Sequence, residues 1–276
     1  MPLKRCFDKR FLSVGLLLCL CSVSQLALAE IDGREIVKQC NYKNPGKDQR
    51  NKLTIILRDR AGNERKSIYQ RLWKDYRGKD MVADKMVLFT EYPPDAVGTG
   101  FMRWAFTEEA GKNADQWIYL PELRKTRRVS IRDPGDSFLG SDLTYADISG
   151  RSLDQDEHKF LKIEEKDGRE LYVVESLPKE SEPLYSKRVS WFTKGGDWES
   201  CVNVGVVYYD RKDQLLKQQS LSWQQVGGDA WMWRRVEVRN VQTGSSSVFE
   251  VDEAEVGVGL KDKVFTERTL KRGYRK

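Results

Sequence analysis

The sequence contains few of the residues on which most enzyme and metal sites depend. It has one histidine, His158, and five cysteines among 276 residues. It also lacks a G-x-S-x-G nucleophile motif and a glycine-rich phosphate loop. The usual signals of serine hydrolases and of nucleotide-binding enzymes are therefore missing. We expect a protein that is not an enzyme and that uses no cofactor and no metal.

Long apolar runs are missing beyond the first 29 residues. Four basic residues precede an apolar run at positions 11–20, and Ala27-Leu28-Ala29 offers an A-x-A cleavage site. This pattern predicts a secretory signal peptide over residues 1–29, and hence export to the periplasm. The run is shorter than the about 20 residues that a membrane span needs, which disfavours an anchor. Leu18 before Cys19 disfavours a lipoprotein site, where a small residue is expected.

A strong excess of charge is absent as well. Cleavage after Ala29 would remove four basic residues and one acidic residue and lower the formal charge from +6 to +3. A charge this small does not indicate a nucleic-acid partner, which would need clustered Lys and Arg. Cys40 and Cys201 would remain, and an oxidising compartment allows them to pair. The sequence does not give their distance, so paired and free cysteines both stay open.

Short apolar-polar alternations make up most of the chain from residue 53 to residue 256. About a dozen strands joined mostly by short turns favour an antiparallel sheet in an up-and-down meander, preceded by a helix near residues 31–40. Residues 265–270 fit a closing helical turn or a last strand. Twist accumulates across so many strands, so the sheet should curl and gain a concave face. No linker interrupts residues 30–276, which predicts one domain.

The segment 127–148, RRVSIRDPGDSFLGSDLTYADI, breaks this succession of strands. Pro134-Gly135 and Leu139-Gly140 turn the chain, and Ser141 or Asp142 could cap a short helix over residues 143–148. An apolar loop and helix between strands must lie against an apolar surface. The nearest such surface is a face of the sheet, so this insert is predicted to be a lid.

The run DSFLGSDLTYADI, preceded by QWIYLPELRKTRRVS, resembles the central signature of the bacterial outer-membrane lipoprotein-sorting protein family, periplasmic relatives of the Lol lipoprotein carriers. The resemblance extends in strand pattern from Ile31 to the C-terminus. It implies a mainly β fold with a few short helices (α+β), a curved antiparallel half-barrel with a helical lid, whose concave face holds acyl chains. It also implies an inner-membrane lipid-exporting transporter as a possible partner.

Rigid aromatic side chains are abundant in the predicted strands and in the insert. Because such rings do not easily fill the hollow of a curved sheet, they suggest a wide apolar cavity that suits acyl chains. The alternative is an ordinary filled core. The residues predicted to line the cavity are Met102, Trp104, Phe106, Trp117, Tyr119, Phe138, Leu143, Tyr145, Trp191, Trp223, Trp231 and Trp233.

Basic residues stand next to the insert. Arg124, Arg127, Arg128 and Arg132 could meet lipid phosphates or an acidic partner at the mouth of the cavity. The alternative for all four is a solvated strand face.

These features favour a periplasmic carrier or chaperone that shields the acyl chains of a lipid or lipoprotein and hands them on. A second hypothesis is a protein-binding adaptor of an envelope transporter, with a filled core and no bound lipid. A third is a periplasmic hydrolase, which would need a cleft where His158 or a pair of carboxylates converges.

Overall fold

The computed structural model describes residues 32–129, 135–149, 151–181 and 183–274. These residues lie within one compact unit, Ile31–Lys276. The predicted signal peptide, residues 1–29, lies outside the described residues and stays a prediction.

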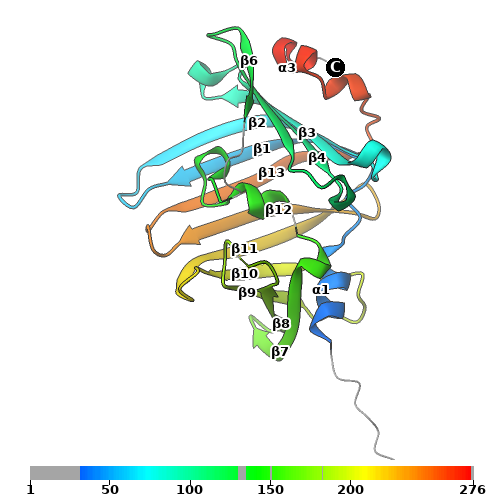
Figure 1. Cartoon of the computed structure of the whole chain (residues 1–276), viewed down its shortest axis with the longest axis vertical. Coiled ribbons are helices and arrows are strands. Elements are labelled where there is room, and N and C mark those ends of the chain that lie inside the picture. Colours follow the sequence, from blue (N-terminus) through cyan, green and yellow to red (C-terminus); the bar gives the residue numbers. More distant parts are fainter. Residues whose placement is uncertain (1–31, 130–134, 150, 182, 275–276) are drawn as a thin grey trace, which may run out of the picture. The chain divides into compact units, whose positions relative to one another are not determined.

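The described residues form one antiparallel sheet of 13 strands, unclosed and curved (Figure 1). The predicted fold class, mainly β with a few short helices, is confirmed. The first half of the chain supplies β1 Asp48–Arg58, β2 Glu64–Asp75, β3 Val82–Tyr92, β4 Gly100–Phe106, β5 Asp115–Leu120 and β6 Lys125–Val129. The second half supplies β7 Asp156–Lys166, β8 Arg169–Pro178, β9 Lys187–Thr193, β10 Asn203–Tyr209, β11 Leu215–Val226, β12 Ala230–Asn240 and β13 Ser246–Val256.

The strand order differs from the single meander that the sequence predicted. Two meanders, β1 to β6 and β7 to β13, are joined by the pairing of β1 with β13 in the middle of the sheet. β6 and β7 are therefore the two edges. The insert connects β6 to β7, so it links opposite edges of the sheet and must pass across one face.

The register assigns side chains to the two faces. Ile55 pairs with Phe249, and Phe249 pairs with Val236. These residues pack with Phe138 and Leu143 of the insert, and we call this side the insert face. Because successive strand residues point to opposite sides, their sequence neighbours belong to the opposite face.

Helix α1, Gly33–Asn41, confirms the helix predicted near residues 31–40, and it packs near the β7 edge. Asp32 caps it by accepting a hydrogen bond from the Arg34 N–H. Ile36, Val37 and Cys40 are buried in a cluster with β8 and β9. A Cβ at Gly33 would lie 2.5 Å from the backbone nitrogen of Phe160, so only glycine permits this approach. Cys40 and Cys201 form a disulfide, which resolves the pairing that the sequence left open.

The C-terminal segment covers the opposite face near the β6 edge, where Figure 1 shows it in red. It consists of η6, Asp262–Val264, and α3, Glu267–Arg272, so its end is helical and not a last strand. Phe265 and Leu270 are buried against β2, β3 and β4. The remaining short helices lie in the connections: η1 Lys79–Met81, η2 Pro94–Ala96, η3 Glu108–Ala110, η4 Phe138–Gly140, α2 Tyr145–Ser149 and η5 Leu153–Gln155.

Candidate functional site

The insert is a tight loop followed by the one-turn helix α2. A bridge between Ser137 and Thr144 closes the loop, and Leu139 and Gly140 take left-handed conformations at its tip. Thr144 Oγ1 accepts a hydrogen bond from the Asp147 N–H, while the Asp147 carboxylate accepts one from the Thr144 N–H. This reciprocal cap replaces the cap at Ser141 or Asp142 that the sequence predicted.

Aromatic contacts hold the insert against the sheet. The ring of Phe138 packs edge to face with Phe101 of β4, 5.9 Å between centroids, and with Tyr145 of α2, 5.7 Å away. Phe138 is only 4% exposed. In Figure 1 the insert lies in green over the central strands of the sheet. The prediction that the insert covers a sheet face is met.

A buried ion pair fixes α2 to β11. Lys217 Nζ lies 2.5 Å from Asp147 Oδ2, with the two side chains 2% and 4% exposed. The same Nζ donates to the Asp142 carbonyl at 3.0 Å, and the Tyr185 hydroxyl donates to Asp147 Oδ1 at 3.0 Å. Burial raises the pKa of Tyr185, so its hydroxyl keeps its proton and remains a donor. We call Asp147, Lys217 and Tyr185 the latch.

A second set of hydrogen bonds holds the insert to β13. The hydroxyl of Ser247 donates to Asp142 Oδ2 at 2.5 Å and accepts from the Asp142 N–H at 2.9 Å. The hydroxyl of Ser245 donates to Asp142 Oδ1. The insert is therefore positioned by polar contacts on both sides of its apolar centre.

A cavity of about 320 Å³ lies between the insert and the sheet. Ten of its lining residues are apolar: Leu53, Trp73, Met86, Phe138, Leu143, Ile148, Leu221, Trp233, Val236 and Phe249. A hollow of about 240 Å³ reaches towards α1 and shares Asp147, Gln219 and Leu221 with this cavity, so the two are neighbours. A mostly apolar hollow with a few polar groups is typical of a small-molecule site.

The polar groups of the cavity include two arginines that the sequence analysis did not single out. Arg71 of β2 donates from Nη1 to Gln49 Oε1 at 2.7 Å, and Arg103 of β4 donates from Nη1 to Asp84 Oδ1 at 3.3 Å. Burial lowers the pKa of Arg71 to about 10, which leaves it charged at neutral pH. The sequence did carry a signal for both arginines, because strand residues two positions apart share a face. Arg71 lies two residues from Tyr69 and from Trp73, and Arg103 lies two residues from Phe101 and from Ala105, so each arginine belongs to a face with apolar neighbours.

Part of the predicted cavity lining is found at the insert. Phe138, Leu143 and Trp233 line the cavity, and Tyr145 packs against the same cluster. Trp223 lines the neighbouring hollow and donates its indole N–H to the Asn203 carbonyl at 2.6 Å. The structure brings these five residues together on the insert face.

The structure places the β4 and β5 residues on the other side of the sheet. Met102, Trp104, Phe106, Trp117 and Tyr119 belong to the opposite face, where four of them pack around the C-terminal segment and Phe106 lies under the ammonium group of Lys112. Their expected position beneath the insert is therefore corrected. Alternation groups residues onto one face, but it cannot tell which face the insert will cover.

Two more predicted tryptophans lie away from both hollows under the insert. Trp191 is on the opposite face, next to Gly205. Trp231 is partly buried at the start of β12, where its backbone N–H donates to the Asn44 carbonyl at 2.7 Å.

Three of the arginines predicted at the cavity mouth, Arg124, Arg127 and Arg128, do not line the cavity. Arg124 lies in the β5–β6 turn with a φ of 49°. The register places Arg127 on the insert face of the edge strand β6, and Arg128 pairs with Asp115. Arg132 lies outside the described residues. Contact of these residues with lipid phosphates or a partner stays a prediction.

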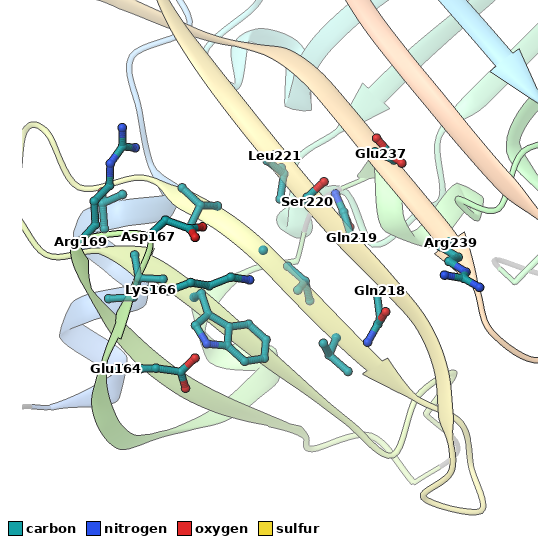
Figure 2. Close-up of a pocket in the computed structure, with 17 residues that line it drawn as sticks. Glu164, Lys166, Asp167, Arg169, Gln218, Gln219, Ser220, Leu221, Glu237 and Arg239 are labelled. Carbon is teal, nitrogen blue, oxygen red and sulfur yellow. The ribbon is translucent and has the colours of Figure 1, made fainter.

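A larger hollow of about 830 Å³ opens on the opposite face (Figure 2). Figure 2 shows Glu164, Lys166 and Arg169 on one side of it and Glu237 and Arg239 on the other. Trp191 of β9 and four residues of β10 also line it, and these strands lie between β8 and β11 in the sheet. Six of its 17 lining residues are charged and six are apolar, so this groove is less apolar than the cavity beneath the insert.

His158 makes structural hydrogen bonds. Its Nε2 donates to the Leu153 carbonyl at 3.1 Å, so Nδ1 accepts from the Ser176 hydroxyl at 2.8 Å. Burial lowers the pKa of His158, in keeping with a neutral ring. Within the described residues, no cluster of histidine, cysteine or acidic side chains could hold a metal ion.

No helix in the described part of the chain is long and apolar enough to cross a membrane.

Comparison with known proteins places this fold. A family model described as an uncharacterized protein matches residues 83–272. A search of curated proteins finds no match. Among solved structures, an outer membrane lipoprotein-sorting protein domain from Vibrio parahaemolyticus is 26% identical with a TM-score of 0.74, over 87% of this chain and 98% of that one.

Two further structures are similar in fold. A DUF1329 family protein from Desulfovibrio piger is 23% identical with a TM-score of 0.74, over 86% of this chain and 97% of that one. A LolA superfamily protein from Nitrosomonas europaea is 17% identical with a TM-score of 0.60, over 86% and 98% of the two chains. The chain therefore belongs to the family whose model matches residues 83–272, and it shares its fold with the outer membrane lipoprotein-sorting and LolA superfamily structures.

Proposed function

We propose that this protein is a periplasmic carrier that shields the acyl chains of a lipid or lipoprotein beneath the insert and hands them on. The observation that carries this proposal is the mostly apolar cavity between the sheet and the insert, the segment that connects the two edge strands β6 and β7. Burial of an acyl chain contributes about 0.8 kcal/mol per methylene, so a covered cavity removes most of the cost of exposing the chain to water.

The size of the cavity indicates how much of a chain the closed form holds. Its volume of about 320 Å³ is near the lower end of the range for small-molecule sites, about 300–1,000 Å³. A longer chain requires the insert to move away from the sheet. Opening connects the cavity with the adjoining hollow of about 240 Å³, because α2 carries Asp147, which lines both.

The latch suits such an opening. A buried ion pair gains Coulomb energy but loses the hydration of both charges, so its net stabilisation is small. When α2 lifts, Lys217 and Asp147 regain water. The insert is thus held in one position without a large barrier to release. An inner-membrane lipid-exporting transporter would be a suitable donor or acceptor.

Lipid extraction tests the carrier function. Protein purified from the periplasm should yield acyl-containing lipid by mass spectrometry. Leu221→Trp, which fills the cavity, should abolish this lipid. Val207→Trp, on the opposite face of the neighbouring strand, is the matched control and should keep it. Folded wild-type protein that carries no lipid and takes none up from vesicles would contradict the proposal.

A reversible crosslink tests the hand-off. Asp142 and Ser247 touch across the insert and β13, so cysteines at both positions should lock the insert when oxidised. We expect the locked protein to retain lipid in the presence of acceptor vesicles and to release it after reduction. Wild type treated with the same reductant controls for the native disulfide. Equal transfer rates in the locked and reduced states would rule out opening of the insert as the release step.

A further inference from the structure

Two arginines stand in the wall of a cavity that is otherwise mostly apolar. Arg71 and Arg103 both line the hollow under the insert, on either side of β3. In the register Arg71 lies opposite Leu88 and Arg103 opposite Met86, so the two arginines share one face of the sheet, with β3 between them. Arg103 is buried and Arg71 is partly buried. Guanidinium groups withdrawn from water without a full set of acceptors are costly, so their presence here needs a reason.

The charges around the cavity are unevenly distributed. Asp84 pairs with Arg103, and Asp147 is neutralised by Lys217. Arg71 has no carboxylate of its own and donates to the neutral amide of Gln49. The four charged lining residues balance as a whole, but in the corner formed by β2, β3 and β4 the two arginines share the single carboxylate of Asp84, so this corner has one positive charge in excess.

The two guanidinium groups also have N–H donors that no described acceptor satisfies. A guanidinium carries five N–H donors. Arg71 and Arg103 each donate one hydrogen bond to a described side chain, and the buried Nε of Arg103 has no partner. Gln116, the register neighbour of Arg103, is 1% exposed and both polar atoms of its side chain lack a partner. This corner therefore has unused donors and a surplus positive charge.

From this arrangement we infer that Arg71 and Arg103 form an anion subsite that binds the carboxylate or phosphate head of an amphipathic ligand whose apolar tail lies along Trp73, Met86 and Trp233. One monovalent anionic group would balance the charge and accept from both guanidinium groups. The inference rests on the proposed carrier function and specifies its ligand class, an acidic acyl lipid in preference to a neutral one.

Binding of matched probes to the purified protein tests the subsite. Lauric acid and lauryl alcohol share one tail and differ in charge, and the fluorescence of Trp73 and Trp233 in the cavity wall reports their binding. A charge-assisted hydrogen bond contributes about 1.5–3 kcal/mol, so we expect the acid to bind roughly ten- to a hundredfold more tightly than the alcohol.

Substitutions assign the preference to the two arginines. Arg71→Gln should weaken binding of the acid about tenfold and leave the alcohol within about twofold. Arg103→Gln combined with Asp84→Asn removes that ion pair without leaving an unpaired carboxylate, and should have the same effect. Lys66→Gln, exposed on the same strand as Arg71, is the charge-matched control and should change neither affinity.

The possible outcomes separate this subsite from the carrier function. Equal binding of acid and alcohol by wild type, or variants that weaken both ligands equally, would overturn the subsite while leaving the carrier intact. Binding of neither probe would contradict the carrier function itself. A third outcome is that inorganic phosphate binds in a manner that depends on Arg71, while neither lauryl probe binds. This result would assign the site to a free anion and overturn the proposal that it binds a lipid headgroup.

Discussion

Asp147 connects the local structure of the insert with its attachment to the sheet. Its carboxylate accepts from the Thr144 N–H at the start of α2, from the Tyr185 hydroxyl, and from Lys217. Lys217 in turn lies 5.0 Å from the Tyr185 ring centroid and 4.8 Å from that of Tyr208. One side chain therefore shapes the helix and fastens it.

Removing one side of the latch should be costly. Lys217→Met leaves Asp147 buried without its cation, and we expect a loss of about 3–5 kcal/mol in the free energy of unfolding, measured by urea denaturation. Adding Asp147→Asn should recover part of that loss, because the unpaired charge is gone. This role would be contradicted if Lys217→Met were as stable as wild type. It would also be contradicted if the double variant lost as much free energy of unfolding as Lys217→Met and Asp147→Asn lose separately, added together.

His158 should make stability depend on pH. Its pKa is lowered in the folded state because burial disfavours the charged ring, so the unfolded chain binds the proton more tightly. This contribution to stability is complete above the unfolded pKa of about 6.5 and declines as the pH falls below it. Between about pH 7.5 and pH 5.5, the free energy of unfolding measured with urea should decrease more steeply for wild type than for His158→Gln. Parallel curves would show that the histidine does not contribute.

At the scale of elements, the insert was the part of the site most readily predicted from sequence. Its turn residues interrupt the strand pattern, and Phe138, Leu143 and Tyr145 require an apolar surface. Its cap could not be chosen reliably, because residues 141, 142 and 144 all carry side chains that can cap a helix. The tertiary contact with Lys217 favours the cap that uses Asp147.

The two faces of the sheet should respond differently to the loss of a tryptophan. Trp233→Ala enlarges the cavity and removes part of its wall, so we expect the dissociation constant for a bound acyl lipid to change severalfold. Trp117→Ala, on the face under the C-terminal segment, should lower stability and leave that constant within about twofold, because it does not reach the cavity. Lipid titration of both variants, with thermal unfolding as the folding control, checks this. Equal effects on lipid binding would contradict the assignment of faces.

In the whole molecule, contacts between segments that are far apart in the sequence hold the two halves of the chain together. β1 pairs with β13, and Cys40 is joined to Cys201 across 161 residues of sequence. A disulfide that closes so long a loop restricts the unfolded chain strongly. It also fixes α1 over the β7 edge, beside β8 and β9.

Loss of the disulfide should destabilise the whole unit. Cys40→Ala with Cys201→Ala is expected to lower the free energy of unfolding by about 2–5 kcal/mol, since the unfolded chain gains conformational freedom. Denaturant titration measures this, and reduction of wild type should reproduce the shift. If the midpoints of the reduced and oxidised proteins coincide, the bond contributes nothing to stability.

The local features of this protein could be predicted from its amino-acid sequence. The strands, the first helix, the position of the insert and the family motif follow from side-chain period, turn residues and a short signature, which depend on neighbours along the chain. Three further features depend on contacts made in the folded protein: β1 pairs with β13, the insert covers the face of Phe249 and Val236, opposite that of Trp104, and Arg71 and Arg103 line one cavity. Alternation pairs residues into faces but carries no information on which face a distant segment will bury, because that choice depends on the packing of all strands together.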